Sequence, residues 1–102
     1  MQYGLSDTII EKICNVLSRH SSVEKAVLYG SRAKGTFKPG SDIDLSLHGA
    51  TITLNELAEI DSELDDLLLP YTFDLLIFDT LSHVKLREHI ERVGKVFYQR
   101  RP

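Results

Sequence analysis

The sequence contains little cysteine, has no excess of basic residues and lacks any long apolar stretch. Its single cysteine, Cys14, can form no internal disulfide, so we expect a buried thiol on a helix face in a reducing compartment. A formal charge of −3 argues against general nucleic-acid binding through a basic surface. No apolar run approaches the roughly 20 residues of a membrane span, and the first residues lack the pattern of a signal peptide. We therefore expect a soluble, cytoplasmic protein.

The apolar pattern predicts alternating helices and strands within one domain, because 102 residues can bury one core but not two. Helical spacing and capping residues predict helices from about Asp7 to His20, Thr53 to Leu69 and Ser82 to Val93. A short helical turn is expected at residues 31–35. The predicted strands are residues 23–29, 42–47 and 72–78, with a β-prone stretch at residues 96–98.

This order of elements predicts an α/β fold, with helices packed on a small mixed β-sheet and a single domain over residues 1–102. The connection between the first two strands is too short for a normal crossover. We therefore expect those two strands to be antiparallel neighbours.

A Gly-Ser pair stands where the first predicted strand ends. Gly30 lacks a Cβ, so its backbone can turn sharply and approach a ligand. Ser31 follows at the mouth of the short helix, where N–H groups and a hydroxyl can bind a phosphate. An ordinary strand-to-helix turn capped by Ser31 is the alternative, and the pair alone does not distinguish the two.

Two aspartates open the second predicted strand at a spacing of two. Because side chains alternate along a strand, Asp42 and Asp44 project from one face. Carboxylate oxygens are ligands for hard divalent cations, and two such ions can hold the attacking and leaving oxygens of a phosphoryl displacement. The alternative, a polar edge on a wet strand face, is disfavoured because aspartate is depleted in strands and adjacent carboxylates repel.

Two carboxylates seldom hold two divalent ions, so a third is expected on a neighbouring strand. Asp74 interrupts an apolar run whose two faces we expect to be buried, and a charge there is costly unless it is paired or binds metal. Asp79 is the rival candidate. It lies at the strand end, where a turn or helix-capping role is sufficient, so we favour Asp74.

The pattern of Gly30–Ser31, ten intervening residues and Asp42-Ile43-Asp44 resembles the signature of the DNA polymerase β-type nucleotidyltransferases. At this length the chain is similar to the minimal nucleotidyltransferase (MNT) proteins, which pair with helical HEPN proteins in toxin–antitoxin systems. The resemblance implies a polymerase β-like nucleotidyltransferase palm fold. It also implies that the third aspartate acts as the base for the attacking hydroxyl.

The activity implied by the resemblance is a Mg²⁺-dependent transfer of AMP from ATP to an acceptor hydroxyl on a HEPN toxin, by which the chain acts as antitoxin. Asp42, Asp44 and Asp74 would be catalytic and would hold two Mg²⁺ ions, with Mn²⁺ as an alternative metal. Gly30, Ser31 and Arg32 would bind the nucleotide. The alternative function is a non-catalytic antitoxin that neutralises a HEPN ribonuclease by masking it.

Further charged residues bear on these hypotheses. The guanidinium of Arg32 suits bidentate hydrogen bonding to phosphate oxygens, although a solvated surface loop explains this residue equally well. For Lys34 and Lys38 the solvated loop is the favoured interpretation. The irregularly spaced histidines do not predict a zinc site, although His48 follows the second strand, where it could contact a ligand. The predicted middle helix carries acidic residues only and the C-terminal segment is basic, which would suit a hetero-oligomeric partner; a homodimer is the alternative.

Overall fold

The helices and strands form in the predicted order. The computed structural model describes residues 1–101, and no helix among these residues is long and apolar enough to cross a lipid bilayer. The elements are α1 (Asp7–Ser18), β1 (Lys25–Tyr29), α2 (Gly30–Lys34), β2 (Ile43–His48), α3 (Leu54–Asp65), β3 (Phe73–Ile77), a 3₁₀ turn (Phe78–Thr80), α4 (Val84–Val93) and β4 (Lys95–Gln99).

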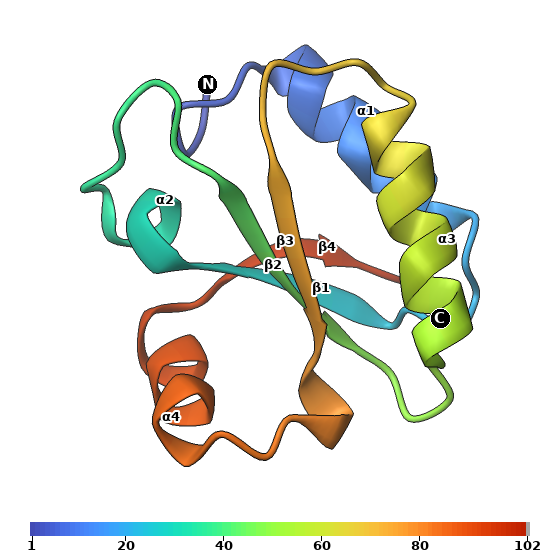
Figure 1. The fold of residues 1–102 in the computed structure, drawn as a ribbon. Coiled ribbons are helices and arrows are strands. Elements are labelled where there is room, and N and C mark those ends of the chain that lie inside the picture. The colour runs from blue at the N-terminus through green and yellow to red at the C-terminus, as the bar shows by residue number, and fades with distance from the viewer. Residues whose placement is uncertain (102) are drawn as a thin grey trace.

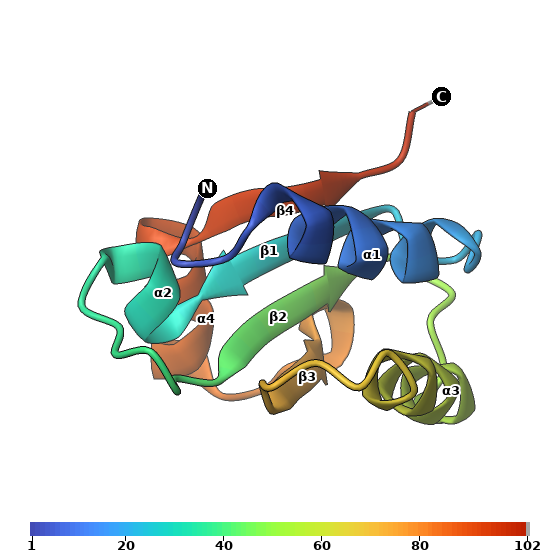
Figure 2. The same ribbon diagram turned by 90° about the horizontal axis from the view of Figure 1, so that it is seen from above.

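The four strands form one mixed sheet in the order β3-β2-β1-β4, as Figure 2 shows from above. β1 pairs antiparallel with both β2 and β4, and β2 pairs parallel with β3. The α/β fold class with a mixed sheet is therefore confirmed, as is the antiparallel pairing of the first two strands. β2, which follows the loop after α2, lies between β1 and β3 and is paired along both of its edges.

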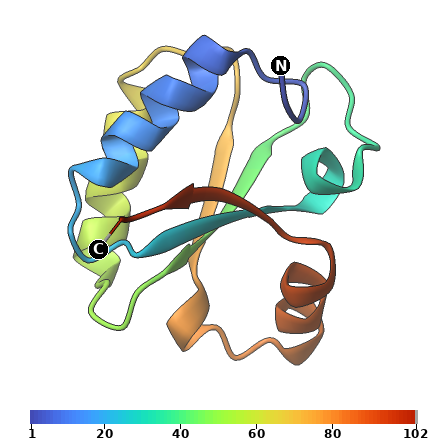
Figure 3. The same cartoon turned by 180° about the vertical axis from the view of Figure 1, so that it is seen from behind.

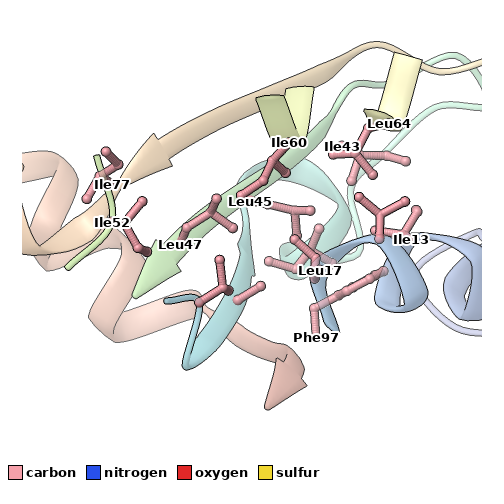
Figure 4. Packing of buried hydrophobic residues seen from close by; sticks show 14 of the residues in the cluster. Ile13, Leu17, Ile43, Leu45, Leu47, Ile52, Ile60, Leu64, Ile77 and Phe97 are labelled. Atoms are coloured by element: carbon pink, nitrogen blue, oxygen red, sulfur yellow. The ribbon is translucent and has the colours of Figure 1, made fainter. Parts of the chain in front are cut away.

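The larger core lies between the sheet and the helices α1 and α3, which run along the same side of the sheet in Figure 1. Ser6 caps α1 by accepting a hydrogen bond from the N–H of Ile9, and Thr53 caps α3 in the same way through Glu56. The apolar stripes of both helices then face the strands. Figure 4 shows this packing for Ile13 and Leu17 of α1, Ile60 and Leu64 of α3, and Leu45 and Leu47 of β2.

The opposite face of the sheet is only partly covered, by α4 (Figure 3). Val27, Tyr29 and Ile90 form a small buried cluster there, with Leu76 and Phe78 packed against it. Alternation along the strands assigns Leu45 to the larger core and Asp44 to this second face. The candidate site therefore lies on the face that has the smaller apolar cluster.

The predicted middle helix is longer than the observed one. α3 ends at Asp65, and Leu68 has a φ of 54° in the left-handed region, which a continuing helix cannot accommodate. Leu68 is 89% exposed and Leu54 is 77% exposed, so neither belongs to the buried stripe that the apolar pattern suggested. Ile60 and Leu64 alone are fully buried along α3.

A histidine between two glutamates joins the end of α1 to α3. The ring nitrogens of the buried His20 lie 3.3 Å from a carboxylate oxygen of Glu56 and 3.0 Å from one of Glu63. Ser22 also donates a hydrogen bond to Glu56. Glu56 and Glu63 of α3 are therefore paired within the chain, whereas Glu59, Asp61 and Asp65 are exposed.

Cys14 lies on α1, where its thiol is 3.6 Å from the carbonyl oxygen of Phe97. The side chain is half-buried, and this burial raises the pKa of the thiol. The expected location on an inward helix face is confirmed, although the burial is partial.

Candidate functional site

Gly30 forms the turn between β1 and α2. Its φ is 73°, a conformation that favours glycine, and a Cβ added there would collide with the carboxylate of Asp44. α2 begins at Gly30 itself, with Tyr29 at the N-cap position and no side-chain cap. The alternative in which Ser31 caps the helix is therefore not observed, and the turn is a place where backbone approaches a carboxylate closely.

The aspartates lie on one face of the sheet. Asp44 of β2 is in register with Asp74 of the parallel neighbour β3, and on its other side with Tyr29 of β1. Asp42 stands two residues before Asp44, just ahead of β2, so the alternation of side chains places it on the same face. Tyr29, Asp44 and Asp74 thus form a row across three strands, beside the Gly30 turn.

The charges in this row act on one another. The pKa of Asp44 is raised from 3.8 to about 6, first by burial and then by the carboxylates of Asp74 and Asp42, with Arg32 opposing. The pKa of Tyr29 is also raised, by burial and by the charges of Asp74 and Asp44. The row therefore concentrates negative charge at a partly buried position.

Asp74 is not in the environment that the apolar run suggested. The expectation that both faces of residues 73–78 are buried is wrong at Asp74, whose side chain is exposed on the edge strand β3, and the apolar neighbours of Asp74 are only partly buried. The apolar neighbours of Asp74 pack on different faces of the sheet. Phe73 and Leu75 pack against the larger core, and Leu76 joins the smaller cluster. Asp74 needs no bound metal to offset a cost of burial.

The donor atoms in this region have the chemistry that Mg²⁺ prefers, namely carboxylate oxygen. In residues 1–101, however, no group of three or more His, Cys, Asp or Glu side chains stands close enough together to hold a metal ion. Asp42 and Asp74 are exposed, so rotation about their side-chain bonds can change the separation of their oxygens. The mutual repulsion that raises the pKa of Asp44 is a cost that a divalent cation would remove.

Arg32 is buried rather than directed at a ligand, with 2% of its surface exposed. Its guanidinium donates to the carbonyl oxygen of Tyr3 at 2.8 Å and to that of Ser41 at 2.8 and 3.1 Å, and it stacks over the rings of Phe37 and Tyr71. The expectation that the guanidinium of Arg32 binds phosphate oxygens does not agree with this geometry. Its role here is to hold the loop that leads to Asp42.

Other residues considered from the sequence lie elsewhere. His48 is at the far end of β2, about 13 Å along the strand from Asp44, where it stacks on Phe78 with 4.3 Å between ring centroids. The expectation that His48 lies near the predicted site is therefore wrong. Burial, with Lys25 and Arg87, lowers the pKa of His48 against the opposing effect of Asp79.

Asp79 has the turn role that made it the weaker candidate. Its Oδ1 accepts a hydrogen bond of 3.0 Å from the N–H of Gly49, which fixes the loop after β2. Lys34 and Lys38 are both exposed, in agreement with a solvated loop.

His89 is a neighbour of the site that the sequence did not indicate. It reaches from α4 to accept a hydrogen bond of 3.3 Å from the N–H of Gly30, and its ring meets that of Tyr29 edge-on. Because Gly30 and His89 are distant in sequence and meet only through the packing of α4 on the sheet, no local pattern could have indicated the contact.

Comparison with known proteins identifies this arrangement. The family described as polymerase beta, nucleotidyltransferase matches residues 11–102, which include the Gly30–Ser31 turn and all three aspartates. The chain belongs to the polymerase β nucleotidyltransferase family. No protein of curated function matches the sequence of this chain.

Solved structures share the nucleotidyltransferase fold. A toxin–antitoxin structure with AMP-PNP is 24% identical with a TM-score of 0.71, covering 95% of this chain and 76% of its own. An MNT antitoxin in complex with the tri-AMPylated HEPN toxin of Shewanella oneidensis is 21% identical with a TM-score of 0.71, covering 94% and 74%. A putative nucleotidyltransferase from Sulfolobus solfataricus is 19% identical with a TM-score of 0.57, covering 89% and 77%.

The raised pKa of Asp44 predicts that this nucleotidyltransferase is stabilised by removing the charge. A carboxyl whose folded pKa lies above 3.8 stabilises the fold when protonated, and this contribution is lost as pH rises through about 6. Because the side chain is partly open to water, we expect Asp44→Asn to raise the free energy of unfolding by about 1 kcal/mol at pH 7.5.

Urea denaturation in EDTA at pH 7.5 and at pH 4 would measure this difference, which should nearly vanish at the lower pH. Asp61→Asn on the exposed surface of α3 is the matched control and should change neither value. A less stable Asp44→Asn variant at pH 7.5 would contradict the electrostatic description.

Proposed function

We propose that this chain is a Mg²⁺-dependent nucleotidyltransferase of the MNT type, formed by residues 1–102 as one domain. It would transfer AMP from ATP to a hydroxyl of a HEPN-family partner protein and so act as its antitoxin. The observation that carries the proposal is the row of Asp44 and Asp74 in register on neighbouring strands, with Asp42 on the same face beside the Gly30 turn.

ATP and the HEPN partner are suggested by the structural relatives described above, one of which contains AMP-PNP and another an AMPylated HEPN toxin. The acidic surface of this chain also favours a protein acceptor over a nucleic acid. A nucleic-acid acceptor would meet repulsion from a protein of net charge −3 whose α3 carries acidic residues only.

In the proposed reaction, Asp42 and Asp44 would hold both Mg²⁺ ions and Asp74 would complete one of the two sites. The bound ions would supply charge neutralisation for the triphosphate. The Asp74 carboxylate would take the proton from the acceptor hydroxyl, whose oxygen forms a bond to the α-phosphorus. The bond from that phosphorus to the bridging oxygen of the leaving group breaks, and pyrophosphate departs. Catalysis would come from positioning and electrostatic stabilisation.

The Gly30 turn would allow the triphosphate to approach the backbone next to Asp44. Ser31 would contribute its hydroxyl and N–H. Since the Gly30 N–H already bonds to His89, a phosphate there would either replace that bond or bind beside it. Arg32 would act indirectly, through its charge and through the loop that it holds before Asp42.

Nucleotide binding predicts a thermal shift that depends on metal. A ligand at about ten times its Kd stabilises the native state by about 1.4 kcal/mol, which for a chain of this size raises Tm by several degrees. We expect this shift with millimolar ATP and Mg²⁺ and its loss when EDTA replaces Mg²⁺. Differential scanning fluorimetry measures it. The absence of a shift with ATP and Mg²⁺, in the presence of the partner as well as without it, would argue strongly against a competent site.

A further inference from the structure

β3 leaves one edge without a strand. It is the outer strand of the order β3-β2-β1-β4, so within residues 1–101 it pairs with β2 alone. The N–H of Ile43 donates to the carbonyl of Thr72, and in a parallel pair this pattern directs the N–H and C=O groups of Phe73 and Leu75 away from β2. These groups can pair with an added strand.

A groove of about 330 Å³ runs between this edge and α3. Leu54, Leu57 and Ala58 of α3 line one side, and Phe73 and Leu75 of β3 line the other. Leu54 is 77% exposed and widens the apolar surface of the groove. The two remaining lining residues, Asp61 and Asp74, are acidic and exposed.

The groove continues into the candidate site through Asp74. Tyr29, Asp44 and Asp74 form a row in register across β1, β2 and β3, and the next position in that row is open. A strand added beside β3 would place one side chain there, with its Cβ roughly 5 Å from that of Asp74 and on the same face. An acceptor hydroxyl at this position would lie beside the carboxylate that we propose as its base.

The charge of α3 indicates the chemistry of the occupant. This helix carries no basic residue, and Glu59, Asp61 and Asp65 are exposed on it, whereas Glu56 and Glu63 are paired with His20. A basic segment with alternating apolar residues is complementary to such a groove. A second copy of this chain would bring another acidic α3 against the first and is disfavoured.

We propose that an extended, basic segment of the acceptor protein docks in the groove between α3 and β3, adds a strand to the free edge of β3, and so presents its hydroxyl to Asp74. The proposal rests on the proposed function for the identity of the acceptor. The docking itself can be measured separately from transfer, so failure of one is distinguishable from failure of the other.

Two substitutions in the groove test the docking by kinetics. Ala58→Arg fills the groove and Asp61→Lys reverses its charge, and both introduce residues that favour helix at exposed positions. We expect each to raise the KM for the HEPN partner by about tenfold or more, as loss of an interface contact does. The thermal shift with ATP and Mg²⁺ should remain. Glu59→Lys makes the same charge change on α3 outside the groove and is the matched control.

Hydrogen exchange of the complex tests the added strand directly. We expect the amides of Phe73 and Leu75 to exchange at least about tenfold more slowly when the HEPN partner is bound. Unchanged exchange in a complex that forms, or an equal KM for all three variants, would overturn the docking even if AMP transfer occurs. If protection instead appears in the chain alone as its concentration rises, the occupant is a second copy. If the partner is bound and protects β3 but is never labelled, the proposed function fails and the docking stands.

Discussion

Replacing both Asp42 and Asp44 by asparagine should lower AMP transfer to the HEPN partner by at least about a thousandfold, which corresponds to ~4 kcal/mol of lost transition-state stabilisation. The substitution keeps the size of both side chains but removes the charge that would hold the cations. Since ionised Asp44 is repelled by its neighbours, the fold should survive the change. Labelled ATP with the purified partner measures transfer directly.

Asp79→Asn is the matched control for this double variant. Asp79 lies in the 3₁₀ turn after β3, and asparagine retains the oxygen that accepts the hydrogen bond from Gly49. Transfer by this control should equal that of the unmodified chain. Equal labelling of the partner by the double variant and by the control would show that Asp42 and Asp44 are not required for transfer.

The same double variant separates catalysis from masking. If the chain neutralises its partner by AMP transfer, cells that express the HEPN protein should lose protection when the double variant replaces the unmodified chain. If it acts by covering the ribonuclease, protection should persist although transfer is gone. We expect loss of protection, because clustered aspartates that destabilise the fold have no evident value to a protein that only binds.

The sequence predicted features that depend on local pattern. The order of elements follows from apolar periodicity and from caps such as Ser6 and Thr53, whose geometry is set within three residues. The antiparallel pairing of β1 with β2 follows from the short connection between them. A shared face for Asp42 and Asp44 follows from alternation along one strand, which needs no knowledge of the rest of the molecule.

Features that depend on packing between distant segments could not be predicted in this way. The apolar run around Asp74 is the same whether β3 is central or at the edge, because an edge strand packed on both faces also buries apolar side chains on each. The contact of His89 with Gly30 requires the position of α4. The resemblance suggests candidate residues for the site, but it does not indicate which of them the fold uses as structural support.

Arg32 is the clearest case of such support, and its removal should have the largest effect on stability. We expect Arg32→Met to lower the free energy of unfolding by about 3 kcal/mol, because methionine leaves partly buried carbonyl oxygens without a donor. The oxygens of Tyr3 and Ser41 lose their hydrogen bonds, and the rings of Phe37 and Tyr71 lose the cation between them. Urea denaturation measures the change. Lys34→Met, on the exposed surface of the same short helix, should alter stability by less than about 0.5 kcal/mol.

The Arg32 variants also decide between support and direct phosphate binding. The guanidinium joins the N-terminal turn to the loop at residues 39–41, which leads directly to Asp42. If support is its role, Arg32→Met should be markedly less stable, and Arg32→Lys should recover only part of that loss, because an ammonium group cannot span carbonyls on two segments as the planar fork does. If Arg32 instead binds phosphate, Arg32→Met should remain as stable as the unmodified chain while the KM for ATP rises. Because only 2% of Arg32 is exposed, we expect the loss of stability.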